Sequence, residues 1–111
     1  GYTVVAHTNS VKALERFRES PTAFDLVITD MTMPEMTGDL LALEMMAIRP
    51  DIPIIICTGY SERLSEESAE EMGIRGFILK PILIRDMATT IRRILDQEDN
   101  AEPPSIMANS A

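Results

Sequence analysis

The sequence DLVITDMTMPEMTG, residues 25–38, decides the fold that we expect for this chain. A short run of strand-forming residues ends on an acid, Asp30, and Pro34 and Gly38 follow. A strand that is apolar on both faces is typical of a parallel sheet covered by helices. In such sheets the functional residues gather where the strands end, at the carboxyl edge. Asp30 is therefore a candidate functional residue.

The rest of the chain alternates between the patterns of strands and helices. Expected strands cover residues 2–7, 25–30, 52–58 and 76–80, and expected helices cover residues 11–19, 39–48, 61–72 and 83–95. Ser10 and Ser61 are candidate N-caps, and Gly73 is placed to end the third helix. This alternation predicts an α/β fold, a doubly wound parallel sheet with helices on both of its faces.

Length and composition indicate one globular domain. The chain has 111 residues, of which 45% are hydrophobic, and a net charge of −8 that argues against contacts with nucleic acid. No apolar run approaches the roughly 20 residues of a membrane span. The single cysteine, Cys57, excludes an internal disulfide and favours a reducing, cytoplasmic location. Residues 1–96 form the predicted domain, and the acidic, proline-containing residues 97–111 are predicted to be a tail or linker.

Three successive strands end on residues whose side chains can take part in a reaction: Asp30, Thr58 and Lys80. A carboxylate can attack phosphorus and form an acyl phosphate. An ammonium group and a divalent metal can balance the charge of the transferring phosphoryl group, and a hydroxyl can donate to its oxygens. Gly59, directly after Thr58, leaves room for a small group to approach. Each residue alone is more often an ordinary turn, strand or surface residue, so the prediction depends on their joint occurrence.

Together with the motifs PIIICTG and GFILKP, the opening stretch resembles the receiver domain of two-component response regulators. The resemblance covers about residues 1–95 and implies a flavodoxin-like fold. It implies that Asp30 is the phosphoacceptor, that Thr58 is the switch hydroxyl, and that Lys80 is the lysine of the phosphorylation site.

The resemblance also assigns supporting roles. Phe77 matches the aromatic residue whose rotamer changes on phosphorylation, and Lys80 and Pro81 match a pair joined by a cis peptide bond. Mg²⁺ is the implied cofactor, with Asp30 and the main-chain carbonyl of Thr32 as ligands. The remaining supporting positions, in the loop after the acceptor and after the switch hydroxyl, are Pro34, Gly38 and Gly59.

The chain departs from the family at its start. Receivers begin with a strand that ends in a pair of magnesium-binding acids, whereas this sequence begins at the family's second strand, residues 2–7. The expected fold is therefore N-terminally truncated, with four of the five strands in the sequence and a gap between residues 2–7 and 25–30. We expect chain outside this numbering, or a second copy that pairs or exchanges elements, to fill the gap. We also expect weak binding of Mg²⁺.

The leading hypothesis is a phosphoacceptor module of a phosphorelay, with a histidine kinase or a histidine phosphotransfer domain as partner. Residues 50–95 look most like receivers at the end of hybrid histidine kinases, although a stand-alone regulator or an N-terminal receiver also fits. The module itself is not expected to be a turnover enzyme. One alternative is a pseudo-receiver that only docks to proteins. A phosphatase of the haloacid dehalogenase type is disfavoured, because Thr32 stands where that family needs a second aspartate.

Overall fold

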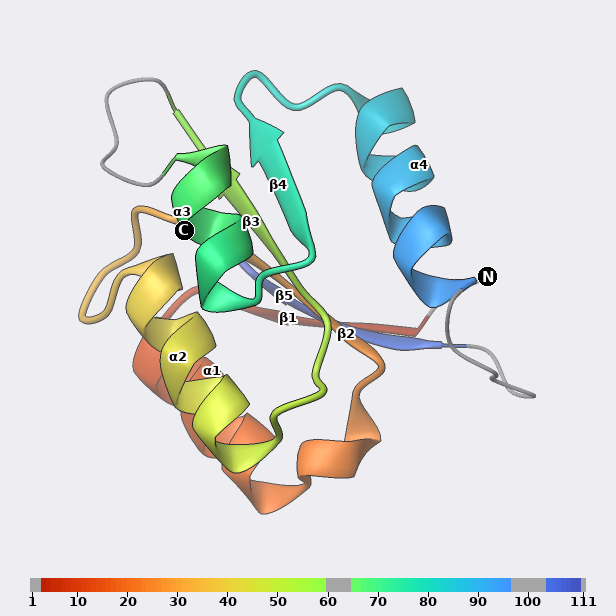
Figure 1. The fold of residues 1–111 in the computed structure, drawn as a ribbon. Coiled ribbons are helices and arrows are strands. Elements are labelled where there is room, and N and C mark those ends of the chain that lie inside the picture. The colour runs from red at the N-terminus through yellow and green to blue at the C-terminus, as the bar shows by residue number, and fades with distance from the viewer. Residues whose placement is uncertain (1–2, 60–64, 97–103, 111) are drawn as a thin grey trace.

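The computed structural model describes residues 3–59, 65–96 and 104–110. Within these ranges the chain forms a parallel five-stranded sheet in the order β1-β5-β2-β3-β4 (Figure 1). The strands are β1 (Thr3–His7), β2 (Leu26–Asp30), β3 (Ile54–Thr58), β4 (Gly76–Leu79) and β5 (Ser105–Asn109). The helices are α1 (Ser10–Glu19), α2 (Gly38–Ile48), α3 (Glu66–Met72) and α4 (Ile84–Leu95), with a short 3-10 helix η1 (Pro21–Ala23).

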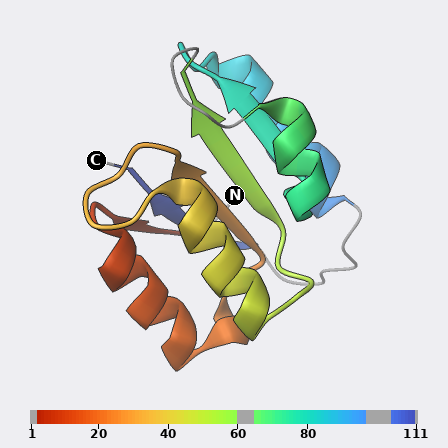
Figure 2. The same cartoon turned by 60° about the vertical axis from the view of Figure 1, so that its left-hand side comes forward.

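Helices cover both faces of the sheet, which confirms the predicted doubly wound α/β architecture. Side chains from α1, α2 and α3 form one core cluster with the sheet, and α4 lies on the opposite face with a second cluster (Figures 1 and 2). Strand β3 is buried along its whole length because it lies between both clusters. This arrangement explains the continuous apolar run that predicted a buried parallel strand.

The strand β5 corrects two predictions. The prediction of a tail or linker over residues 97–111 is wrong for Ser105–Asn109, which lie between β1 and β2. The prediction that four of the five strands lie in this sequence is wrong for the same reason. β5 fills the position of the missing strand, so in the described residues the gap is closed by this chain itself rather than by a second copy.

Contacts at both ends of β5 fix its place in the sheet. Before the strand, the Thr3 amide donates to the Pro104 carbonyl at 2.9 Å. At its start, the Ser105 amide donates to Asp25 Oδ2 at 2.8 Å. After the strand, the Ser110 amide donates to the His7 carbonyl at 2.9 Å. Asp25 therefore has a structural role at the junction of β2 and β5.

The helix ends follow ordinary capping chemistry, with one correction. Asn9, not Ser10, caps α1, because its side chain accepts hydrogen bonds from the amides of residues 11 and 12. Ser65 caps α3, and Ser61 lies outside the described residues. Gly73 ends α3 as predicted, with a left-handed φ of 95° that favours glycine.

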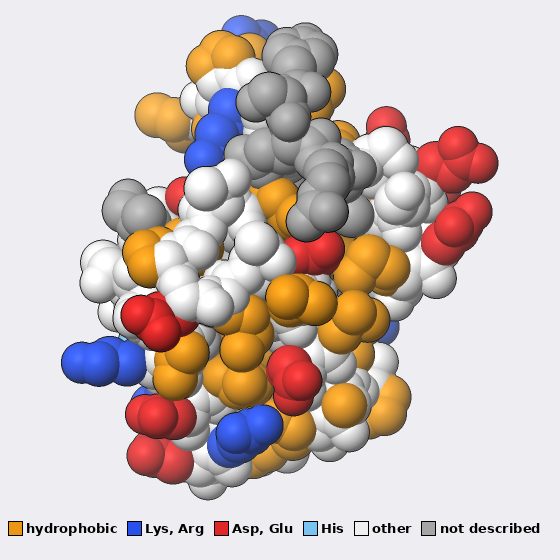
Figure 3. Space-filling view, turned by 90° about the vertical axis from the view of Figure 1, so that its left-hand side faces the viewer, with side chains coloured by type: hydrophobic (Ala, Val, Ile, Leu, Met, Phe, Trp, Pro, Cys, Tyr) orange, Lys and Arg blue, Asp and Glu red, His pale blue; other side chains and the backbone are white. Residues whose placement is uncertain are grey.

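Two helices leave apolar side chains in contact with solvent. In α4 the apolar residues Ile91, Ile94 and Leu95 are buried, whereas Ile84 at its start is 88% exposed. In α2, Leu40 and Leu43 are about half exposed. Figure 3 looks at the side of the molecule where α1 and α2 lie in Figure 1, and hydrophobic side chains gather there among charged ones. Among the described residues, no helix has the length and apolar character needed to cross a membrane.

Candidate functional site

The carboxyl edge of the sheet brings two of the three predicted strand-end residues into direct contact. Asp30 is the last residue of β2, and Lys80 directly follows β4. The ammonium nitrogen of Lys80 lies 3.6 Å from Asp30 Oδ2. The Asp30 side chain is 15% exposed and that of Lys80 is 39% exposed. A carboxylate and an ammonium group thus share one partly open site.

The same Asp30 oxygen has a second partner that the sequence analysis missed. Ser110, which follows β5, donates a hydrogen bond from Oγ to Asp30 Oδ2 at 3.0 Å. The neighbouring Asn109 is buried, and its Nδ2 donates to Ser10 Oγ at 3.0 Å and to Thr29 Oγ1 at 3.1 Å. The local sequence held little signal for this contact, because the prolines and acids before residue 105 favoured a tail.

Thr58 is fully buried at the end of β3. Its Oγ1 lies 3.4 Å from the carbonyl oxygen of Gly59, to which it donates, and its own carbonyl accepts from the Lys80 amide at 2.8 Å. In the register of the sheet, Thr58 pairs with Leu79, two residues after Phe77. Because side chains alternate between faces along a strand, Thr58 and Phe77 lie on the same face of neighbouring strands. Phe77 is half-buried against the α1–α3 cluster.

The loop between β2 and α2 folds back onto the end of β2. The Gly38 amide donates to the Met31 carbonyl at 2.7 Å, and a Cβ atom on Gly38 would collide with the carbonyl oxygen of Asp30. Glycine is therefore required here by close approach of the backbone. Pro34 is exposed within this loop, and Glu35 has a positive φ of 73°. The loop thereby fixes the backbone on which Asp30 sits.

Two further features belong to the same edge. The Lys80–Pro81 peptide bond is cis, as the resemblance implied. Cys57 pairs with Asp30 in the register of β2 and β3 and is buried. Burial raises the pKa of the Cys57 thiol to about 11, and the negative charge of Asp30 adds to this rise. Cys57 is therefore a neutral thiol at ordinary pH and serves as a small core residue.

The residues present do not fit a dedicated magnesium site. In the part of the chain that the structure describes, no three His, Cys, Asp or Glu side chains gather closely enough to hold a metal ion. Asp30 supplies one carboxylate, and Thr32 lies exposed two residues later. The contacts to Asp30 Oδ2 come instead from the ammonium group of Lys80 and the hydroxyl of Ser110. Mg²⁺ binds oxygen ligands and favours carboxylates, so this donor set is poor.

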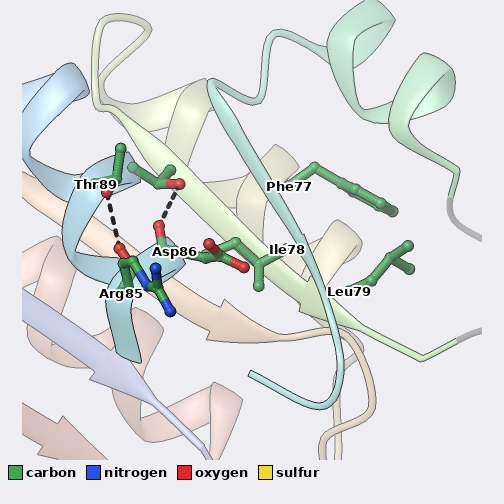
Figure 4. Close-up of a pocket in the computed structure, with 7 residues that line it drawn as sticks. Phe77, Ile78, Leu79, Arg85, Asp86 and Thr89 are labelled. Carbon is green, nitrogen blue, oxygen red and sulfur yellow. Dashed lines mark hydrogen bonds between the residues drawn. The ribbon is translucent and has the colours of Figure 1, made fainter. Parts of the chain in front are cut away.

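A separate cavity of about 430 Å³ lies between β4 and the first turns of α4 (Figure 4). Ile78, Arg85, Asp86 and Thr89 are among the residues that line it. In Figure 4, Phe77 extends away from α4, toward the other face of the sheet. The cavity lies beside the exposed apolar residues that precede and begin α4, which are Leu79, Ile82, Leu83 and Ile84.

A family model, curated relatives and a solved structure all point to the same family. The family model described as the response regulator receiver domain matches residues 1–92. The sensor kinase CckA of Brucella abortus is 35% identical over 99 residues, and the response regulator receiver protein CpdR of the same organism is 34% identical over 95 residues. A crystal structure of a response regulator receiver domain protein from Clostridium thermocellum superposes with a TM-score of 0.79 and 28% identity.

The relatives differ greatly in length. The match covers 89% of this chain but 10% of CckA, and 86% of this chain but 78% of CpdR. The Clostridium thermocellum structure is matched over 85% of this chain and 75% of its own. The chain thus spans a small part of some relatives and most of others.

Proposed function

Because this chain belongs to the response regulator receiver domain family, we propose that it is a phosphoacceptor module of two-component signalling and that Asp30 is its acceptor. A carboxylate oxygen of Asp30 attacks the phosphorus of a donor phosphohistidine, and the bond between phosphorus and the imidazole nitrogen breaks. Asp30 becomes an acyl phosphate, and the released imidazole takes up a proton. The observation that carries the proposal is the contact between Asp30 and Lys80 at the carboxyl edge of the sheet.

Lys80 has two tasks in this proposal. Before transfer, its ammonium group lies 3.6 Å from Asp30 Oδ2 and holds the carboxylate at the site. During transfer, negative charge gathers on the phosphoryl oxygens, and a fixed positive charge beside them lowers the barrier. Both side chains are partly exposed, so a phosphodonor can reach them.

Thr58 and Phe77 carry the response to phosphorylation in this proposal. The Thr58 hydroxyl lies near the acceptor edge, and Phe77 lies on the same face of the neighbouring strand. A phosphoryl oxygen on Asp30 would draw the hydroxyl toward it, because charged oxygens are strong hydrogen-bond acceptors. Movement of Thr58 would make room for Phe77 to change its rotamer. The affected face includes β4 and the helices beside it.

Receiver domains interact with histidine kinases or phosphotransfer proteins, and we propose a partner of this kind here. The similarity to CckA favours the receiver of a hybrid histidine kinase as the larger context. We propose that the chain does not contact nucleic acid, because its net charge of −8 repels phosphates. We also propose that it is located in the cytoplasm. Exposed apolar residues around the start of α4 offer a surface for a protein partner.

The test is covalent labelling of the purified chain. Wild type is incubated with acetyl phosphate and excess Mg²⁺, and its intact mass is measured. We expect one added phosphoryl group on wild type and on the control Asp51→Asn, whose side chain is 77% exposed and lies outside the site. Asp30→Asn should not be labelled, because an amide is a poor nucleophile. Equal labelling of wild type and Asp30→Asn would refute the assignment.

A protein-docking pseudo-receiver is the second candidate function. The poor fit of the site to Mg²⁺ favours it, because phosphoryl transfer to receivers is expected to use the metal. The same labelling experiment separates the two candidates. A folded wild-type chain that gains no phosphoryl group under excess donor and Mg²⁺ would support the docking module.

A further inference from the structure

The strand β5 brings an unexpected pair of residues to the acceptor site. β5 lies where the resemblance implies a strand that ends in two magnesium-binding acids. In this chain the corresponding end carries Asn109 and Ser110, neither of which is charged. The difference changes the electrostatics of the site, because two formal negative charges are replaced by an amide and a hydroxyl.

The register determines which of the two residues faces the acceptor. Asn109 pairs with Thr29, so the next residue, Ser110, lies beside Asp30. Ser110 is tied to β1 through its amide, and its Oγ donates to Asp30 Oδ2 at 3.0 Å. Asn109 points to the other face and uses its amide nitrogen on Ser10 and Thr29.

The charge at the site is therefore balanced without a metal. Asp30 and Lys80 carry opposite unit charges at 3.6 Å, and Ser110 adds a neutral donor to the same oxygen. A divalent cation that approaches Asp30 Oδ2 would have to displace the Ser110 hydroxyl and would be repelled by Lys80. Among the described residues, no group of three His, Cys, Asp or Glu side chains gathers there to offset these costs.

We propose that Ser110 is a positioning residue, that Ser110 and Lys80 together hold the Asp30 carboxylate, and that the site does not bind Mg²⁺ tightly. The proposal concerns the site of the proposed function and rests on Asp30 being its centre. Its test measures metal binding and the environment of Asp30. It can therefore fail while Asp30 is still phosphorylated, or hold when Asp30 is not.

The first experiment is a calorimetric titration of the 111-residue chain with Mg²⁺. Wild type should bind weakly, and Ser110→Asp should bind about tenfold more tightly or better, because a second carboxylate then faces Asp30. The control Ser20→Asp adds the same charge at an exposed position at the end of α1 and should leave the affinity unchanged. Tight binding by wild type, or no gain in a folded Ser110→Asp variant, would overturn the proposal.

The second experiment uses Ser110→Ala and does not depend on the charged variant. Its affinity for Mg²⁺ should not fall, because the hydroxyl holds Asp30 and is not a metal ligand. The ¹³C resonance of the Asp30 side-chain carboxyl should shift in Ser110→Ala and should return toward wild type in Ser110→Thr. Loss of Mg²⁺ affinity in Ser110→Ala, or an unchanged Asp30 resonance, would overturn the proposal.

Discussion

At the scale of single residues, Asp30, the proposed acceptor, is held by backbone geometry as much as by side chains. Gly38 lets the loop after β2 return so closely that its amide bonds to the Met31 carbonyl. Ser110 and Lys80 then fix the carboxylate of Asp30. The position of Asp30 therefore depends partly on Gly38 and Ser110, which take no part in the proposed chemistry.

Gly38→Ala tests this dependence. The added methyl group would collide with the Asp30 carbonyl oxygen, so we expect a loss of about 1–3 kcal/mol in the free energy of unfolding, measured in urea. Labelling of Asp30 by acetyl phosphate should also slow. The matched control is Gly73→Ala, which costs about 1–2 kcal/mol through its left-handed φ but lies at the opposite edge of the sheet. Equal labelling rates in the two variants would contradict the role of Gly38 at the site.

Because of the buried thiol of Cys57, we expect the free energy of unfolding to depend on pH in the alkaline range. Burial, with a contribution from the charge of Asp30, raises the thiol pKa from its ordinary value of 9.0 to about 11. Between those pH values the folded protein keeps a proton that the unfolded chain loses, so the free energy of unfolding falls as pH rises through this window. Urea unfolding at several pH values should show a smaller fall in Cys57→Ala. If the free energy of unfolding fell equally with pH in both proteins, the raised pKa of the Cys57 thiol would be contradicted.

Single residues were predictable where the strands end on unusual side chains. Asp30, Thr58 and Lys80 stand out because each closes an apolar run, and parallel strands bring their ends to one edge. Ser110 was not predictable in this way, since its partner lies 80 positions earlier in the chain. Asn9 was missed as a cap because Ser10 beside it has the same capping chemistry.

At the scale of elements, β5 decides whether the sheet is complete. Ile106 and Met107 are buried on opposite faces of the sheet, one in each core cluster. Hydrogen bonds join β5 to both β1 and β2. A five-residue strand thus covers two edges that would otherwise be open to pairing with other chains.

Met107→Ala tests the burial of β5. Met107 is fully buried, so we expect a loss of about 2–5 kcal/mol in the free energy of unfolding. The control is Met87→Ala in α4, a methionine that is partly buried and should cost less. Urea denaturation followed by circular dichroism measures both. A cost for Met107→Ala no greater than that for Met87→Ala would mean that residues 105–109 form the tail that the sequence predicted.

The four strands before residue 81 were predictable because each is a β-rich run bounded by turn or helix signals. The fifth was not. The segment SIMAN holds one β-branched residue and follows two prolines and a polar stretch, which is typical of a linker. Its structure depends on the gap between β1 and β2, a feature of the assembled sheet that local sequence does not contain.

At the scale of the whole molecule, a sheet without a gap between β1 and β2 predicts a monomer. Because β5 comes from the same chain, no second copy is needed to satisfy the edges of β1 and β2. Size-exclusion chromatography with light scattering should give a mass near 12.4 kDa. A stable dimer whose formation is abolished by changes in β5 would instead indicate exchange of this strand between two copies.

The central claim is that the whole fold serves to present Asp30 as a phosphoacceptor, and chemical trapping tests it most directly. After incubation with acetyl phosphate, borohydride reduces an acyl phosphate of aspartate to homoserine, which fragmentation mass spectrometry can assign to one residue. We predict homoserine at position 30 and unmodified aspartate at positions 25, 39 and 51. Homoserine at another aspartate, or no homoserine in a folded and donor-saturated sample, would contradict the account.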